Sequence, residues 1–180
     1  AIVSLGTWKF DGDADGNYQE DEFNEDGQVI GQTTTPYSYA LDGLFVGDMP
    51  QTSYALVGTL TPVKGLQLQA VYNQYDNNYS DWSPGAREYD GSDADVDREQ
   101  VWKAPGYSKV DLHASYALPI SGYDVSLFGH VFNATDAVFV QDAVDHSQYN
   151  SYGDKVHAAH NAEVFLGTPR YFNVGIAVNF

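Results

Sequence analysis

The sequence contains no cysteine among its 180 residues, which excludes both a disulfide-stabilised scaffold and any metal site built from thiolates. Basic residues are also scarce, because 8 Lys and Arg stand against 25 Asp and Glu and leave a formal net charge of -17. A chain this acidic is not suited to holding nucleic acid through its phosphates, so we expect no nucleic-acid partner. Long apolar runs are missing as well, and none approaches the roughly 18 residues of a membrane-spanning helix.

The composition is nevertheless that of a folded protein. Hydrophobic residues make up 43% of the chain and aromatic residues 14%, which is more than a disordered acidic chain contains. The length corresponds to one domain. A mean hydropathy of -0.38 leaves a membrane β-barrel open, since barrel strands alternate between lipid-facing and lumen-facing residues.

Six segments that are poor in charge alternate apolar and polar residues with period two, which is typical of strands with one apolar face. Each is about as long as the roughly 9 to 11 residues that a tilted strand needs to cross a bilayer. The predicted strands cover residues 1–10, 52–61, 66–75, 108–120, 123–132 and 170–180.

The connections between these strands differ in length at the two ends. Short turns are expected at Pro62–Gly65 and at Ser121-Gly122, whereas long acidic loops follow Phe10, Tyr75 and Phe132. This is the pattern of outer-membrane barrels. We therefore predict an all-β fold, an antiparallel transmembrane β-barrel segment of about six strands with long acidic extracellular loops. A soluble sandwich with one solvated face gives the same alternation, so the pattern alone leaves it open.

A two-residue turn at Ser121-Gly122 sets the register of the strands that flank it. It places His113 opposite His130 and puts both, together with Asp111, on the polar face, because a charge on the lipid face costs roughly 2 to 4 kcal/mol. Two facing imidazoles can share a metal ion or contact an anionic ligand, and they can equally be polar wall residues bound to water. Weaker ligand-binding candidates lie in the loops: His157, His160, Tyr79, Trp82 and Trp102.

The first acidic loop contains the sharpest motif. Residues 11–22 match the calcium-loop template D-x-[DN]-x-[DN]-G-x5-E at every specified position. A twelve-residue wrap can deliver the six to eight oxygens that Ca²⁺ needs at about 2.3 to 2.6 Å. We expect one structural calcium ion, the alternative being a solvated loop neutralised diffusely by salt. The expected ligands are Asp11, Asp13, Asp15, Glu22 and, through its backbone carbonyl, Asn17.

Phe180 closes an alternating strand with an aromatic residue, which resembles the C-terminal signal of bacterial outer-membrane proteins. Residues 129–136 (Gly-His-Val-Phe-Asn-Ala-Thr-Asp) and residues 167–170 (Gly-Thr-Pro-Arg) resemble the end of the penultimate strand and the opening of the final strand in TonB-dependent outer-membrane receptors. Residues 43–51 are similar to such receptors from the Bacteroidota. Residues 1–180 thus resemble the C-terminal barrel segment, roughly the last six of its strands.

The resemblance implies a location in the bacterial outer membrane and uptake of a scarce ligand such as a metal chelate, vitamin, glycan or peptide, with no enzymatic chemistry. The implied partners are the rest of the barrel and its plug domain, the TonB complex acting through the plug, outer-membrane lipid and a surface lipoprotein. Two alternatives stay open. One is a passive or structural outer-membrane barrel protein, and the other is a secreted β-sandwich that binds carbohydrate through loop aromatics.

Overall fold

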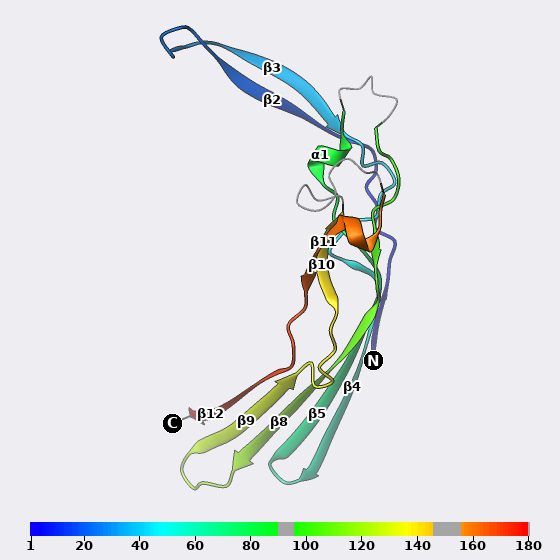
Figure 1. Cartoon of the computed structure of the whole chain (residues 1–180). Coiled ribbons are helices and arrows are strands. Elements are labelled where there is room, and N and C mark those ends of the chain that lie inside the picture. The colour runs from blue at the N-terminus through cyan, green and yellow to red at the C-terminus, as the bar shows by residue number, and fades with distance from the viewer. Residues whose placement is uncertain (90–95, 146–155, 180) are drawn as a thin grey trace.

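A computed structural model describes residues 1–89, 96–145 and 156–179 (Figure 1). The fold is all-β, and every pairing between its strands is antiparallel. Within these ranges, no helix has the length and apolar character needed to cross a membrane. The elements in chain order are β1 (Ile2–Leu5), β2 (Ala14–Phe23), β3 (Val29–Tyr39), β4 (Pro50–Val63), β5 (Leu66–Tyr79), α1 (Pro84–Arg87), β6 (Glu88–Tyr89), β7 (Lys103–Ala104), β8 (Tyr107–Leu118), β9 (Asp124–Phe132), β10 (Val140–Asp145), a 3₁₀ turn (Ala159–Asn161), β11 (Ala162–Leu166) and β12 (Tyr171–Asn179).

The main sheet runs in the order β1-β4-β5-β8-β9-β12, with the short β7 also paired to β5. The six strands in this order coincide with the six segments predicted from alternation, and they are arranged in the sheet in their sequence order. The last of them ends at Asn179, and Phe180 lies outside the described residues. In the described part of the chain β1 and β12 are the outer strands, and no pairing joins them.

The first predicted strand is shorter than expected. It is regular only from Ile2 to Leu5, whereas a strand over residues 1–10 was predicted. The chain leaves the ladder because the Trp8 ring folds over Gly6, where any larger side chain would collide with it. The Trp8 backbone N–H then donates to the Gln51 side chain at 2.6 Å, and Lys9 forms an isolated bridge with Phe45.

The two short turns lie at the predicted places at the lower end of the sheet (Figure 1). In the first, Val63 pairs with Leu66 across Lys64-Gly65, so the loop has two residues, and a bulge follows Leu60. Gly65 adopts φ +85°, a left-handed conformation that glycine takes at little cost. In the second, Leu118 pairs with Val125 as predicted, which fixes the register of the strands on either side.

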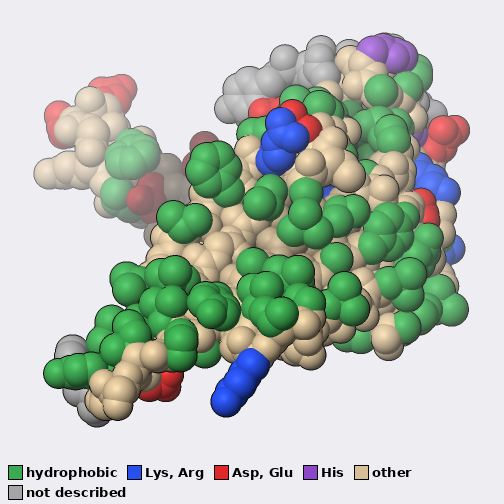
Figure 2. Space-filling view, turned by 90° about the horizontal axis from the view of Figure 1, so that it is seen from below, with side chains coloured by type: hydrophobic (Ala, Val, Ile, Leu, Met, Phe, Trp, Pro, Cys, Tyr) green, Lys and Arg blue, Asp and Glu red, His purple; other side chains and the backbone are tan. Residues whose placement is uncertain are grey.

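The sheet has one apolar and one polar face. On β12, Phe172, Val174 and Ile176 are 77%, 82% and 61% exposed, and they share a face. Figure 2, which views the molecule from the turn end, shows hydrophobic side chains gathered over the sheet. The same face carries Leu56, Leu60, Leu68, Leu112 and Leu127, each at least 39% exposed. The opposite face carries a continuous polar row across five strands: Thr59, Gln69, His113, His130 and Asn173.

A long β-hairpin stands where the first acidic loop was expected to be irregular. Strands β2 and β3 pair from Ala14 opposite Tyr39 to Phe23 opposite Val29, and the hairpin projects away from the main sheet (Figure 1). The Asn24 side-chain oxygen accepts hydrogen bonds from the backbone N–H groups of Asp26 and Gln28, which closes the tip. The acidic segment after Phe10 therefore contains regular strands that were not predicted, because the hairpin is exposed on both faces and has no apolar alternation to indicate it.

The hydrophobic core lies where the loops converge. Leu41, Leu44 and Val101 are almost fully buried, and all three lie outside the long strands of the main sheet. Phe10, Tyr39, Tyr79 and Trp82 pack around them. The buried core of the described residues therefore lies at the loop end, beyond the upper ends of the long strands.

Candidate ligand-binding site

The upper end of the polar face forms a cavity of about 310 Å³ beneath the loops. Tyr75 on β5 and Tyr107 on β8 are register partners, with ring centroids 4.9 Å apart. The Phe139 ring, which precedes β10, stacks on Tyr107 at 4.1 Å. Three aromatic rings from three segments therefore line one side of the cavity.

Two carboxyl groups form the other side of this cavity. Asp48, which has φ +57°, and Asp142 on β10 both line it. Burial raises the pKa of Asp48 to about 7, and the hydrogen bond and charge of Asp142, together with the charge of Asp81, add to this rise. Among the described residues, Asn78 Nδ2 and Asp142 Oδ1 are buried without a hydrogen-bond partner. Aromatic faces beside paired carboxyl groups and unpaired polar atoms suit a ligand with hydroxyl or ammonium groups.

A buried charge cluster ties the loops together next to this cavity. His157 Nδ1 lies 2.5 Å from Asp145 Oδ2, and His157 Nε2 lies 3.1 Å from Asp97 Oδ2. Arg87 Nη1 lies 3.4 Å from Asp97 Oδ1, and both of these side chains are 2% exposed. The hydrogen bonds to Asp145 and then Asp97 raise the pKa of His157 to about 9, against the effect of burial. Because the cluster connects chain segments that are far apart in sequence, its role is to stabilise the arrangement of the loops.

Most of the predicted calcium loop is extended in this structure. Residues 14–23 are an extended strand, and at roughly 3.4 Å per residue Asp15 and Glu22 lie about 24 Å apart, far beyond the reach of one ion. The Asp15 carboxylate accepts a hydrogen bond from the Ser38 hydroxyl at 2.6 Å, and Glu22 accepts one from Thr33. Asn17 belongs to the same paired strand.

Asp13, the second expected ligand of that motif, instead holds several segments of the loop end together. Its carboxylate accepts hydrogen bonds from the Arg98 guanidinium, the Tyr89 hydroxyl and the backbone N–H groups of Leu41 and Asp42. The Arg98 hydrogen bond, followed by that of Tyr89, holds the pKa of Asp13 well below its usual value. Among the described residues, no group of three or more His, Asp or Glu side chains could hold a metal ion, and Asp11 joins no such group.

The predicted histidine pair is formed. His113 and His130 are register partners, with Nδ1 atoms 2.7 Å apart and rings edge to face. Asp111 lies two residues away on the same face of β8, but its Oδ1 accepts a hydrogen bond from the Asn133 backbone N–H at 2.8 Å. His160 is exposed on the 3₁₀ turn, away from the pair.

The three loop aromatics have separate surroundings. Tyr79 lines the cavity and stacks on Phe45 with centroids 4.1 Å apart. Trp82 packs against Tyr39 and the core, whereas Trp102 contributes its backbone N–H to Asp145. The structure thus places only one of the three in the cavity.

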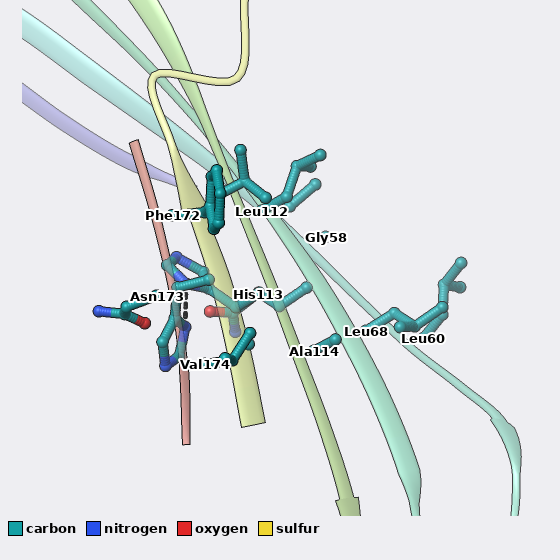
Figure 3. Close-up of a pocket in the computed structure, with 14 residues that line it drawn as sticks. Gly58, Leu60, Leu68, Leu112, His113, Ala114, Phe172, Asn173 and Val174 are labelled. Carbon is teal, nitrogen blue, oxygen red and sulfur yellow. Dashed lines mark hydrogen bonds between the residues drawn. The ribbon is translucent and has the colours of Figure 1, made fainter. Parts of the chain in front are cut away.

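A second hollow, of about 570 Å³, lies on the apolar face (Figure 3). Gly58 and Ala114 leave space there between Leu60, Leu68 and Leu112. Its exposed lining is mostly apolar, so it fits an acyl chain better than a polar soluble ligand.

No protein-family model matches the chain, and neither curated proteins nor solved structures include a match to it.

Proposed function

We propose that this chain is a wall segment of an outer-membrane receptor barrel of the TonB-dependent kind, and that it helps to bind the ligand that such a receptor takes up. The observation that carries the proposal is the two-faced sheet. Its apolar face is exposed on every long strand, and its polar face leads up to a cavity lined by aromatic and carboxyl groups.

The exposed apolar face calls for an apolar environment, since burying one Val, Leu, Ile or Phe side chain is worth about 1.5 to 3 kcal/mol. In a sandwich a second sheet would cover this face. The smaller sheets β2-β3-β6 and β10-β11 lie at the loop end instead (Figure 1). The apolar side chains stay exposed in the described part of the chain, which argues against the secreted sandwich. Lipid can cover them, and strands β4 and β5, of 14 residues each, are long enough to cross a bilayer.

The open edges of the sheet support the same proposal. In lipid an unpaired backbone group costs several kcal/mol, so β1 and β12 need neighbouring strands. We propose that the remaining strands of the barrel supply them. A plug domain inside the same barrel would face the polar row and couple the site to the TonB complex.

In this arrangement the ligand binds first at the loop end. The cavity between Tyr75, Tyr107 and Phe139 presents aromatic faces, while Asp48 and Asp142 present oxygens. A glycan or an amine-bearing ligand fits this chemistry best. Release into the lumen would then pass over the polar row of the sheet.

The topology can be tested with two single cysteines, since the chain has none of its own. Glu25→Cys lies at the tip of the β2–β3 hairpin, and Lys64→Cys lies in the short turn at the opposite end of the molecule (Figure 1). Both would be introduced into the natural polypeptide, and intact bacteria would be treated with a membrane-impermeant maleimide.

We expect Glu25→Cys to be labelled on intact cells and Lys64→Cys to be labelled only after the outer membrane is permeabilised. Equal labelling of both cysteines on intact cells, or recovery of the protein in the medium, would contradict an outer-membrane barrel. Urea-denatured samples, in which both cysteines react, provide the control for intrinsic reactivity.

A further inference from the structure

The polar row across the sheet contains two imidazoles whose Nδ1 atoms converge. His113 and His130 are opposite each other on β8 and β9, and their Nδ1 atoms are 2.7 Å apart. Figure 3 labels His113 near Asn173, and the register places both residues with His130 on the polar face. We propose that His113 and His130 together bind a divalent transition-metal ion, of which Cu²⁺ is the tightest.

The separation of the two nitrogen atoms supports a chelate. Metal–nitrogen bonds of about 2.0 to 2.1 Å at a right angle place two ligand nitrogens about 2.9 Å apart. The observed 2.7 Å is close to that span, so a small rotation of each ring is enough to admit the ion. The backbone pairing of β8 and β9 holds both rings in place, which lowers the entropy lost on binding.

The pair can present two lone pairs without losing a proton to solvent. In the metal-free state one Nδ1 donates a hydrogen bond and the other accepts it. If the donor ring moves its proton from Nδ1 to Nε2, both Nδ1 lone pairs point at the ion and both rings stay neutral. The ion therefore takes the place of the shared proton, and acid competes with it because a protonated imidazole has no lone pair.

The neighbours of the pair leave room for further donors. A hollow of about 300 Å³ on the polar face is lined by the two histidines with Gln67, Gln69 and Ser115. The Gln69 Nε2–H donates to the Thr59 hydroxyl at 3.2 Å, so the oxygen of that amide is the atom available to a cation. Water completes the coordination in this open site.

The same neighbours determine which metals the site selects. None of the residues that line the hollow carries a carboxylate, and the nearby Asp111 oxygen is already bonded to the Asn133 backbone. Neutral imidazole and amide donors favour Cu²⁺, Ni²⁺ and Zn²⁺ over Ca²⁺ and Mg²⁺, which require several charged oxygens. The order of affinity should follow Cu²⁺ above Ni²⁺ and Zn²⁺.

The test is titration of the natural polypeptide, purified in detergent, with Cu²⁺, and separately with Zn²⁺ and Ca²⁺. Wild type is compared with His113→Ala and His130→Ala, and His160→Ala, which removes an exposed imidazole outside the pair, is the matched control. We expect each variant of the pair to bind Cu²⁺ at least about tenfold more weakly, on the order of the loss produced when a ligand shell is disturbed. The His160→Ala protein should bind as wild type does.

Electron paramagnetic resonance of the Cu²⁺-loaded wild type gives a readout that does not depend on any variant folding. Two equivalent imidazole nitrogens should couple to the copper, and one should remain in either single variant. Unchanged affinity in both pair variants, loss of binding only in His160→Ala, or a wild-type spectrum without a nitrogen pair would overturn the inference. The inference does not rest on an outer-membrane location, and the labelling of Glu25→Cys and Lys64→Cys tests that location separately.

Discussion

The main sheet and the loop assembly above it differ in where their apolar side chains lie. Val174 and Phe172 on the sheet are largely exposed, whereas Leu41 and Leu44 in the loop assembly are almost fully buried. Charged groups show the reverse, since Arg87 is buried among the loops, whereas the exposed apolar row of β12 from Phe172 to Val178 contains no charged side chain. The loop assembly has a packed interior, whereas under the proposed function the apolar face of the sheet would be covered by lipid and its edges by neighbouring strands.

The largest effect should follow from breaking the buried charge cluster. Asp97→Ala would leave Arg87 and His157 without their shared carboxylate, at a cost of about 3 to 5 kcal/mol. Urea unfolding followed by tryptophan fluorescence measures it, because all three tryptophans lie at the loop end.

The matched control for this prediction is an exposed ion pair. Arg170 and Asp136 lie 3.8 Å apart with side chains 53% and 51% exposed. Arg170→Ala, which removes this exposed pair, should therefore cost about 0 to 1 kcal/mol. Equal losses in the two variants would show that the loop assembly is not a packed interior.

A charge on the apolar face should have the next largest effect. Val174→Lys places an ammonium where lipid is expected, at a cost of about 2 to 4 kcal/mol near the bilayer midplane. Asn173→Lys, one residue away on the polar face, should be tolerated. The measurement is the fraction of protein recovered folded in the membrane, and a sheet bathed in water on both faces would accept both substitutions.

Within the acidic motif, Asp13 and Glu22 should respond differently. Asp13→Asn weakens the hydrogen bonds to Arg98 and Tyr89 and should cost about 1 to 2 kcal/mol, limited by the solvent exposure of Arg98. Glu22→Gln, on the projecting hairpin, should change stability by less than about 0.5 kcal/mol. The melting temperatures of the two variants, with and without added Ca²⁺, measure this difference. A loss of stability in Glu22→Gln that occurs only in the presence of Ca²⁺ would instead support calcium binding by residues 11–22.

Stability should also depend gradually on pH. Because the pKa of His157 is raised from 6.5 to about 9, its ion pairs stabilise the protein fully below pH 6.5, and this contribution is lost as the pH rises through 9. The pKa of Asp48 is raised from 3.8 to about 7, so the stability linked to its protonation is lost in the lower window, from pH 3.8 to 7. His157→Gln should flatten only the upper part of the melting curve against pH, and Asp48→Asn only the lower part.

Sequence reasoning succeeds where short-range patterns set the structure. The histidine pair is predictable because a tight turn at Ser121-Gly122 fixes the register of β8 against β9. The apolar face is predictable because residues on β12 alternate strictly. Side-chain alternation along a strand and the register set by a tight turn both depend only on residues that are close in the sequence.

Sequence reasoning fails where contacts are distant or where strands lack an apolar face. The β2–β3 hairpin is exposed and rich in acidic residues, so it has no apolar alternation from which its strands could be predicted. The cavity between Asp48 and Asp142 brings together residues that are far apart in the sequence, and no motif in the sequence indicates that they lie close together. Tyr75 and Tyr107 could have been paired by extending the sheet register upward.

The central claim is that lipid covers one face of the sheet. Single cysteines at Val174 and at Asn173, labelled with bimane in the natural polypeptide and reconstituted with brominated phospholipid, test it most directly. Bromine quenches only fluorophores that touch the acyl chains, so the label at Val174 should be strongly quenched and the label at Asn173 much less, with the same alternation at Phe172 and Ile176. Equal quenching at all four positions, or none at Val174, would contradict the account.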